Sequence, residues 1–403
     1  MTKTYLDSEE HNLCCGCGAC MAICPQKAIH MRQGYDKAFY PVIDDNLCVN
    51  CNACRRVCPF INRFASDDFE RKAYAAVIEN KDLHLQSASG GAFEGIADAL
   101  TRISKDCFVV GAEWTKNLRV CHSVKAAGER NAFKKSKYLQ SDCSGIYNEV
   151  KQRLISNNTV LFTGTPCQVA ALKSFLGKDY PNLYTIDLVC HGIAGEGVFA
   201  KYIRDIECRV GQKVVSVEFR KKKKDIYGEI HSRNIMLSFE DGRTQIISSD
   251  VDSYLRGYHK GLFYRESCYS CPFANSKRNS DITIGDYWHI QKLYSDMVDY
   301  TGVSCVLVNT KKGKELIDKT DGLNLRQTSV DFLLKHNNQL REPCKIPGNR
   351  SYFFKYIDII QFDVLIGQLM GKPKYIKRMV SALLPGKVKR FLRVEKGNGT
   401  SIT

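Results

Sequence analysis

Alternating apolar and polar runs in the middle of this 403-residue chain predict strand–turn–helix units. Residues 159–162 are apolar over the length of a buried strand, residues 164–165 have turn composition, and the proline at position 166 fits the first residue of a helix that runs to about residue 176. A second strand is predicted at 184–189, and apolar residues at a helical period follow residue 92. We therefore expect a mixed α/β domain here.

The same pattern divides the chain into three parts. Two short apolar runs, 28–31 and 39–43, predict a hairpin in a small N-terminal unit, residues 1–65. A large mixed α/β unit is expected at 66–345, followed by a basic helical unit at 346–403, so the predicted fold class is α+β. Further strands are predicted at 73–78, 108–114, 119–124 and 303–308, a hairpin at 235–247, and helices at 145–155 and 312–318.

Composition favours a cytoplasmic protein. Nineteen cysteines in a chain that starts without an apolar signal region argue against secretion and against a disulfide framework. The most apolar late stretch, residues 352–370, is interrupted by Lys355, Asp358 and Asp363, which are too costly in a membrane-spanning helix. The basic run at 372–396 leaves peripheral contact with the inner membrane surface as an alternative to a solvated tail.

Eight cysteines near the N-terminus follow one pattern twice, at an offset of 34 residues. Three cysteines at this spacing wrap one corner of a 4Fe-4S cubane, and their loop is too tight to supply the fourth ligand, which therefore comes from the other copy. We expect one cluster on the first triplet with Cys58, and a second on the second triplet with Cys24. The two copies of Cys-x2-Cys-x2-Cys-x3-Cys-Pro are Cys14, Cys17, Cys20 and Cys24, then Cys48, Cys51, Cys54 and Cys58.

Structural zinc is the alternative, since thiolates at Cys-x2-Cys spacing also bind zinc. Zinc ribbons use isolated pairs, whereas here two triplets are each followed by Cys-Pro, which favours iron–sulfur clusters. Cys15 lies inside the first triplet without altering its Cys-x2-Cys spacing, and we assign it no ligand role. Roughly the first 62 residues resemble the bacterial two-cluster ferredoxins, so the N-terminal unit is expected to be a two-cluster 4Fe-4S ferredoxin domain.

Four later cysteines are candidates for a third 4Fe-4S cluster. Cys167 falls in the first turn of the helix predicted at 166–176, where the positive end of the helix stabilises a thiolate. Cys190 follows a predicted strand, and Cys268-x2-Cys271 precedes a proline. The alternative is that free thiols are ordinary core residues. We adopt that interpretation for the remaining cysteines: Cys107, Cys121, Cys143, Cys208, Cys305 and Cys344.

A Ser-Ala-Ser-Gly-Gly turn at residues 87–91 precedes the helix predicted after residue 92. Backbone N–H groups at such a helix start bind anions, which suits the pyrophosphate or ring edge of a flavin. The alternative is that Ser89 is a plain N-cap, with the two glycines easing the turn.

Several motifs resemble the coenzyme F420 hydrogenase/dehydrogenase beta-subunit family over about residues 70–345. They occur in order as Gly164-Thr165-Pro166-Cys167-Gln168, Cys190-His191-Gly192, Cys268-x2-Cys271 and residues 281–288. Family members are iron–sulfur oxidoreductases that contain FAD, so the resemblance implies FAD, with FMN as the alternative.

The resemblance also implies where the flavin binds. His191 is the candidate catalytic residue, as a proton relay to reduced flavin, and a hydrogen-bonded neighbour of the cluster is the alternative. The implied flavin contacts are Ser87, Ser89, Gly90, Gly91, Lys137, Tyr138, Gln140, Ser141, Gly164 and Thr165.

We therefore expect an iron–sulfur flavin oxidoreductase that carries electrons from a ferredoxin or flavodoxin-like carrier to an organic substrate. The alternative is an electron-transfer protein within a larger hydrogenase or dehydrogenase complex, without a substrate of its own. The net charge of +16, which bound clusters would lower to about +10, favours docking of an acidic carrier on the basic body, including the five cations at 220–224. Nucleic acid is not expected, because that run has no interleaved aromatic residues.

Overall fold

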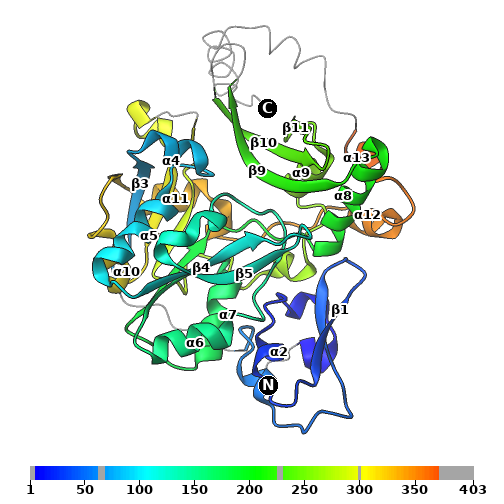
Figure 1. Ribbon diagram of the computed structural model, residues 1–403, viewed down its shortest axis with the longest axis horizontal. Helices are drawn as coiled ribbons and strands as arrows, with labels where there is room; N and C mark the ends of the chain where they lie inside the picture. Colours follow the sequence, from blue (N-terminus) through cyan, green and yellow to red (C-terminus); the bar gives the residue numbers. More distant parts are fainter. Residues whose placement is uncertain (1–4, 62–68, 225–229, 298–300, 372–403) are drawn as a thin grey trace, which may run out of the picture.

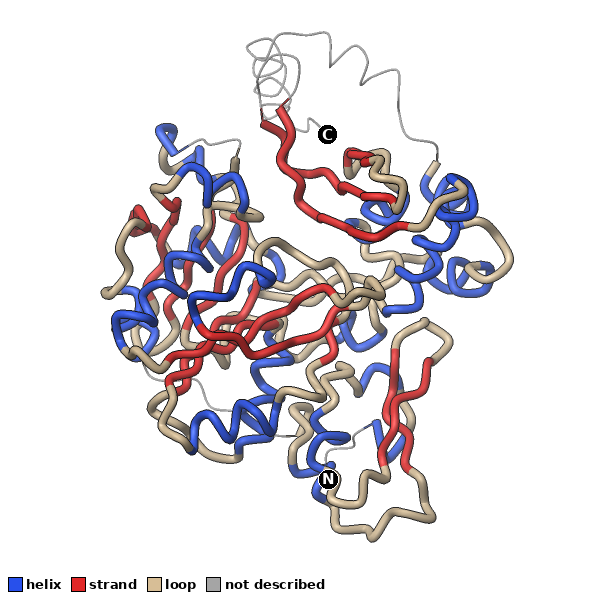
Figure 2. The backbone as a smooth tube through the Cα atoms, viewed as in Figure 1, coloured by secondary structure: helices blue, strands red, loops and turns tan. Residues whose placement is uncertain are grey.

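Three β-sheets with flanking helices make up the computed structural model, which describes residues 5–61, 69–224, 230–297 and 301–371. The sheets have two, three and nine strands and occupy separate parts of the molecule (Figure 2). The predicted α+β class is confirmed. Over the described ranges, no helix has the length and apolar character needed to cross a membrane.

The N-terminal unit is a hairpin with three short helices (Figure 1, blue). Its strands pair antiparallel from Ile29 opposite Ile43 to Gln33 opposite Phe39, so the predicted hairpin is confirmed. The elements are α1 (Tyr5–Ser8), α2 (Ala19–Ile23), β1 (Ile29–Gln33), β2 (Phe39–Ile43) and α3 (Ala53–Arg56).

The nine-stranded sheet runs in the order β14-β3-β13-β12-β8-β7-β4-β5-β6. Its centre, from β12 to β4, is parallel, and antiparallel strands flank it. The carboxyl ends of β7 and β8 are therefore neighbours, as ligand-binding α/β sheets require. The strands are β3 (Lys72–Ile78), β4 (Cys107–Trp114), β5 (Val120–Ala126), β6 (Ser141–Asp142), β7 (Thr159–Gly164), β8 (Leu183–Leu188), β12 (Ile282–Asp286), β13 (Ser304–Val308) and β14 (Leu323–Thr328).

Helices cover this sheet, and two of them also contact the N-terminal unit. The cluster formed by α6, α7 and β7 includes Ala19 and Val57 of that unit, so the two parts share one apolar core. The predicted helix at 145–155 begins slightly later, at Tyr147. The helices are α4 (Lys81–Gln86), α5 (Ala92–Ile103), α6 (Tyr147–Ile155), α7 (Pro166–Leu176), α10 (Lys311–Ile317) and α11 (Val330–His336).

The three-stranded sheet packs on four helices in the part of Figure 1 drawn mostly in green. The first part of the predicted C-terminal unit does not stand apart, because Phe353, Phe362 and Ile366 are buried in this same core. The basic run at 372–396 lies outside the described residues. The elements are α8 (Glu196–Val210), β9 (Val214–Lys224), β10 (Ile230–Phe239), β11 (Thr244–Ser248), α9 (Ser253–His259), α12 (Arg350–Tyr356) and α13 (Phe362–Met370).

Candidate functional site

Four of the N-terminal cysteines share one small cavity, and we call them the inner set: Cys14, Cys17, Cys20 and Cys58. All four line a cavity of about 30 Å³, together with Cys15 and with Cys54 of the second triplet. The loop before α2 bends at Gly16 and Gly18, whose φ angles of 65° and 75° favour glycine. Burial, and then the neighbouring thiols, raise the pKa of Cys20 well above its ordinary value. The fold thus brings together the ligands predicted for the first cluster.

The outer set, Cys24, Cys48, Cys51 and Cys54, lies nearer the solvent. Cys51 is exposed and the other three are half-buried. Burial is the largest cause that raises the pKa of Cys54, and Cys24 and Cys48 add to it. Two apolar side chains in the same loop, Leu47 and Val49, are 50% and 60% exposed. This half of the repeat therefore presents an apolar, cysteine-bearing surface to solvent.

The third set, Cys167, Cys190, Cys268 and Cys271, gathers at the carboxyl ends of the parallel strands. Cys167 lies in the first turn of α7, which follows β7, and Cys190 comes shortly after β8. Cys268 lies in the 3-10 helix η3 (Glu266–Ser270), and Cys271 is the residue that follows this helix. Burial, then Cys190 and Cys271, raise the pKa of Cys268 well above its ordinary value. Four thiols from three segments thus face one another.

Cys15, which the spacing left without a role, lies between the inner and third sets. Its thiol hydrogen-bonds with the thiols of both Cys17 and Cys167. The contact with Cys15 is the largest cause that lowers the pKa of Cys167, to about 7. The two predicted cluster sites are therefore adjacent, which no local sequence signal indicates.

Each of the three sets consists of four thiol donors. In the part of the chain that the structure describes, no group of three or more His, Cys, Asp and Glu side chains converges to hold one ion. Mononuclear zinc needs its thiolates about 2.3 Å from one centre. A cubane is bound at its corners by four thiolates, which are then further apart. The four thiolates in each set are the number and type of donor that a 4Fe-4S cluster takes.

A cavity of about 580 Å³ lies beside the third set, and Cys190 and His191 line it. Its volume is within the roughly 300–1,000 Å³ of cofactor and ligand sites. His191 is exposed to the cavity, and partial desolvation by the surrounding protein lowers its pKa. Eight of the ten predicted flavin contacts line the cavity: Ser87, Ser89, Gly91, Lys137, Tyr138, Ser141, Gly164 and Thr165.

The other two predicted contacts, Gly90 and Gln140, lie outside the cavity lining. A Cβ at Gly90 would be 2.1 Å from the Ala76 carbonyl oxygen, so this glycine allows close approach to β3 and β13. The Gln140 side chain points to the N-terminal unit, where its Nε2 donates to the Gly16 carbonyl at 2.8 Å. Both residues therefore have packing or docking roles that their position in the motif does not reveal.

The N-cap alternative for Ser89 is wrong. The N-cap of α5 is Gly91, in the left-handed conformation at φ 83°, and no side chain caps the helix. The Ser89 hydroxyl instead donates to the Val303 carbonyl at 3.0 Å. The 87–91 turn is thus held against β13 at the cavity wall.

Arg220 departs from the solvated face expected for residues 220–224. Its guanidinium donates to both carboxylate oxygens of Asp286, at 2.8 and 3.0 Å, and to the Ala88 carbonyl. This partly buried pair lines the cavity, and Arg220 lowers the pKa of Asp286 against the opposing effect of desolvation. Arg220 therefore belongs to the cavity wall, and only Lys223 and Lys224 of this run are fully exposed.

Lys137 is half-buried at the cavity wall. Its ammonium donates to the carbonyls of Ala132 and Lys134 at 3.0 and 2.8 Å, and desolvation lowers its pKa to about 7. Lys137 therefore holds the 132–137 loop in the shape that forms the cavity edge.

The six cysteines assigned to the core divide into three groups by exposure. Cys107, Cys143 and Cys305 are buried as predicted, Cys121 and Cys344 are half-buried, and Cys208 is exposed. The Cys344 thiol donates to the His191 carbonyl at 2.9 Å. The core prediction is thus wrong for Cys208, which lies on the outer side of the amphipathic helix α8.

Two family models match the chain. Residues 13–62 match the 4Fe-4S dicluster domain, and residues 157–328 match the model of the carboxyl-terminal part of the coenzyme F420 hydrogenase/dehydrogenase beta subunit. Comparison with curated proteins gives no match. Among solved structures, the chain is similar to one from a xenon derivative of the F420-reducing NiFe hydrogenase complex of Methanosarcina barkeri, with 14% identity, coverage of 76% of this chain and 94% of that chain, and a TM-score of 0.42.

Both family matches agree with the cysteine sets described above. The dicluster model spans the inner and outer sets, and the beta-subunit model spans the third set and most of the cavity wall. The resemblance inferred from the motifs is confirmed: residues 13–62 match a 4Fe-4S dicluster domain, and residues 157–328 match the carboxyl-terminal part of the coenzyme F420 hydrogenase/dehydrogenase beta-subunit family.

Proposed function

We propose that this chain relays electrons from a ferredoxin or flavodoxin-like carrier, through three 4Fe-4S clusters, to an FAD that reduces an organic substrate. The observation that carries the proposal is the continuity of the site. Cys15 contacts both Cys17 and Cys167, and Cys190 belongs to the third set while also lining the cavity. The third set is therefore the link between the N-terminal unit and the cavity.

The chain's own residues supply binding, positioning and a proton. When bound, the clusters supply one-electron transfer and the flavin supplies hydride transfer. The turn at 87–91 and the β7–α7 turn at Gly164 and Thr165 would hold the flavin at the cavity wall. His191 faces the cavity and is the proposed proton donor. Each two-electron reduction consumes two one-electron carriers and two protons.

The outer set is the proposed docking face for the carrier. Cys51 is exposed beside the apolar side chains of Leu47 and Val49, whereas the inner set packs against the large domain and its four cysteines are half-buried. The basic run at 220–224 is a poorer docking face than expected, because Arg220 lines the cavity wall. A carrier would therefore meet the end of the molecule where a cluster lies nearest to solvent.

Iron and flavin content test this proposal directly. Anaerobically isolated protein should hold about twelve iron atoms if all three sets bind 4Fe-4S clusters, and about eight would exclude the third. Cys268→Ser should remove about four iron atoms and spare the N-terminal pair, whereas Cys208→Ser, at the exposed cysteine, should remove none. Zinc in place of iron would overturn the proposal.

Flavin binding is tested at the cavity wall. Ala112 lines the cavity from β4, whereas Ala126 is exposed at the end of the paired strand β5. Ala112→Phe should therefore lower flavin occupancy with iron content unchanged, and Ala126→Phe should change neither. Equal flavin occupancy in both variants would place the flavin elsewhere.

The family match favours a second candidate, an electron-transfer subunit of a hydrogenase or dehydrogenase complex. This candidate predicts that the isolated chain reduces no organic substrate until a partner protein is added. Steady turnover by the isolated chain with reduced ferredoxin and substrate would exclude it.

A further inference from the structure

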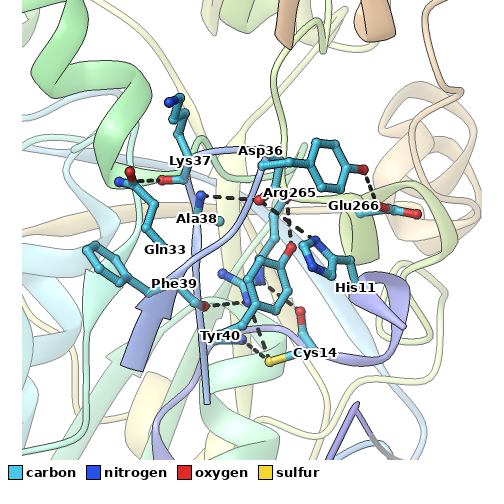
Figure 3. A network of polar contacts seen from close by, with 12 residues as sticks. His11, Cys14, Gln33, Asp36, Lys37, Ala38, Phe39, Tyr40, Arg265 and Glu266 are labelled. Carbon is cyan, nitrogen blue, oxygen red and sulfur yellow. Dashed lines mark hydrogen bonds and ion pairs between the residues drawn. The ribbon is translucent and has the colours of Figure 1, made fainter. Parts of the chain in front are cut away.

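Arg265 is a buried side chain of the large domain that reaches into the N-terminal unit. It is 1% exposed and lies three residues before Cys268. Its Nε donates to the Cys14 carbonyl and its Nη2 to the Phe39 carbonyl, both at 2.7 Å. Figure 3 shows the guanidinium between the inner-set loop and the β1–β2 hairpin. One side chain thus joins the third set's segment to the first cysteine of the inner set.

The remaining contacts of Arg265 also converge on the inner-set loop. Its Nη2 lies 3.4 Å from the Cys14 Sγ, and its Nη1 donates to the Gln140 Oε1 at 2.9 Å. Gln140 in turn donates to the Cys15 and Gly16 carbonyls at 3.2 and 2.8 Å. The guanidinium carbon lies 4.1 Å from the centre of the Tyr40 ring. The loop is therefore held by several donor groups of Arg265 and Gln140 rather than by one contact.

The positive charge of Arg265 forms no hydrogen-bonded ion pair with a carboxylate among the residues that the structure describes. The nearby buried carboxylate of Asp36 instead accepts from the Tyr40 hydroxyl at 2.7 Å and lies 3.8 Å from Arg350. A buried cation without an anion is strongly destabilising. Among the neighbouring acidic groups, Cys14 has the largest electrostatic interaction with Arg265, ahead of Asp36. The Cys14 sulfur lies at hydrogen-bond distance from the guanidinium, so a negatively charged group held by the inner set would be the counter-charge of Arg265.

The outer set has a different electrostatic environment. An arginine contact to this set runs from Arg56 to the carbonyl of the exposed Cys51, at 3.0 Å, where solvent screens charge. Arg55, on the same helix, pairs with Asp7. The buried guanidinium against a ligand sulfur is thus a feature of the inner set.

We propose that Arg265 is the positioning residue that docks the Cys14 loop on the large domain, and that its charge makes the inner set the more easily reduced of the two N-terminal sets. This inference rests on the proposed function, since it requires a 4Fe-4S group on each set. Reduction adds one electron, and thus one negative charge, to the inner set, and a buried cation at hydrogen-bond distance from a ligand sulfur favours that form.

The test uses the anaerobic holoprotein and an EPR-monitored redox titration with dithionite as the electron source. Arg265→Met should lower the reduced fraction of one N-terminal cluster about tenfold at a fixed potential, which corresponds to about 59 mV for a one-electron couple. Arg265→Lys should restore most of that fraction, because it keeps the charge. The matched control is Arg350→Met, since Arg350 contacts Tyr35, the Tyr264 carbonyl and Asp36 but not Cys14.

Amide hydrogen exchange over residues 14–20 gives a second readout. Arg265→Met should speed exchange there, and Arg265→Lys should do so less. Equal titration curves for the wild type and Arg265→Met, or equal shifts in Arg265→Met and Arg350→Met, would overturn the proposal.

If Arg265→Met binds no iron, Arg265→Gln repeats the test, because its amide can still donate to the Cys14 carbonyl. Selective loss of about four iron atoms in both neutral variants, but not in Arg265→Lys, also supports the proposal. A wild type without iron would refute the proposed function itself, whereas full iron with unshifted potentials refutes only the role of Arg265.

Discussion

The inner and outer cysteine sets have the same spacing and different surroundings. The inner set packs against α6 and α7, and Arg265 donates to the Cys14 carbonyl. The outer set ends at solvent, with Cys51 and Val49 exposed. A repeated motif therefore determines how many thiols meet, whereas the interface around each copy determines what that copy does. Under the proposed function, the outer copy would meet the carrier and the inner copy would pass electrons inward.

Loss of a single ligand from each set should separate the two sets most strongly. Cys20→Ser and Cys51→Ser should each remove about four iron atoms. Cys20→Ser should also lower the stability of the large domain by more than about 2 kcal/mol, because its set is part of a shared core. Cys51→Ser should leave the large domain nearly unchanged. Iron assays and anaerobic thermal unfolding measure both effects, and equal destabilisation would contradict the contrast.

Charge on the outer surface should slow the carrier. The double variant Leu47→Asp with Val49→Asp places two carboxylates beside Cys51, where an acidic carrier would dock, and should lower the rate of flavin reduction by ferredoxin about tenfold. Lys223→Glu with Lys224→Glu changes the charge more, but on the exposed end of β9. Stopped-flow reduction at low and physiological salt compares them. A larger effect of the lysine double variant would indicate that the carrier docks on the basic body instead.

The smallest expected effect comes from removing one buried hydrogen bond beside the inner set. The Tyr147 hydroxyl donates to the Cys17 carbonyl at 2.7 Å, across the interface of the inner set. Tyr147→Phe should cost about 0.5–1.5 kcal/mol locally, and so speed amide exchange over residues 14–20 roughly 2- to 12-fold. Tyr352→Phe, at a tyrosine that is 44% exposed, is the control. No change in exchange, or a change over the outer set instead, would argue against this contact.

Much of the fold could be predicted because local rules agree with it. Pro166 begins α7, and Thr165 and Gln168 form the capping box behind it, so the strand–turn–helix unit is encoded within a few residues. The cysteine repeat likewise carries its chemistry in its spacing. Both the hairpin at β1–β2 and the one at β10–β11 follow from turn residues between apolar runs.

The missed features depend on contacts between distant segments. The role of Cys15 depends on its contact with Cys167, and that of Arg220 on its ion pair with Asp286. The role of Arg265 depends on its hydrogen bond to the Cys14 loop. A run of five cations predicts a solvated surface, and only the course of β9 past the cavity turns Arg220 inward. Such pairings leave no local signal, because each partner alone has an ordinary composition.

The distance in sequence between Cys14 and Arg265 has a consequence for how the protein is made. The two residues are separated by 251 positions, and α12 and α13, which complete the core beside Arg265, are later still. At about 5–20 residues per second, the ribosome needs roughly 10–50 s to add the segment that covers the inner set. The N-terminal cysteines therefore emerge, and can receive iron, as a free domain, and during that interval both halves of the repeat are equally open to the cluster-loading machinery and to oxygen.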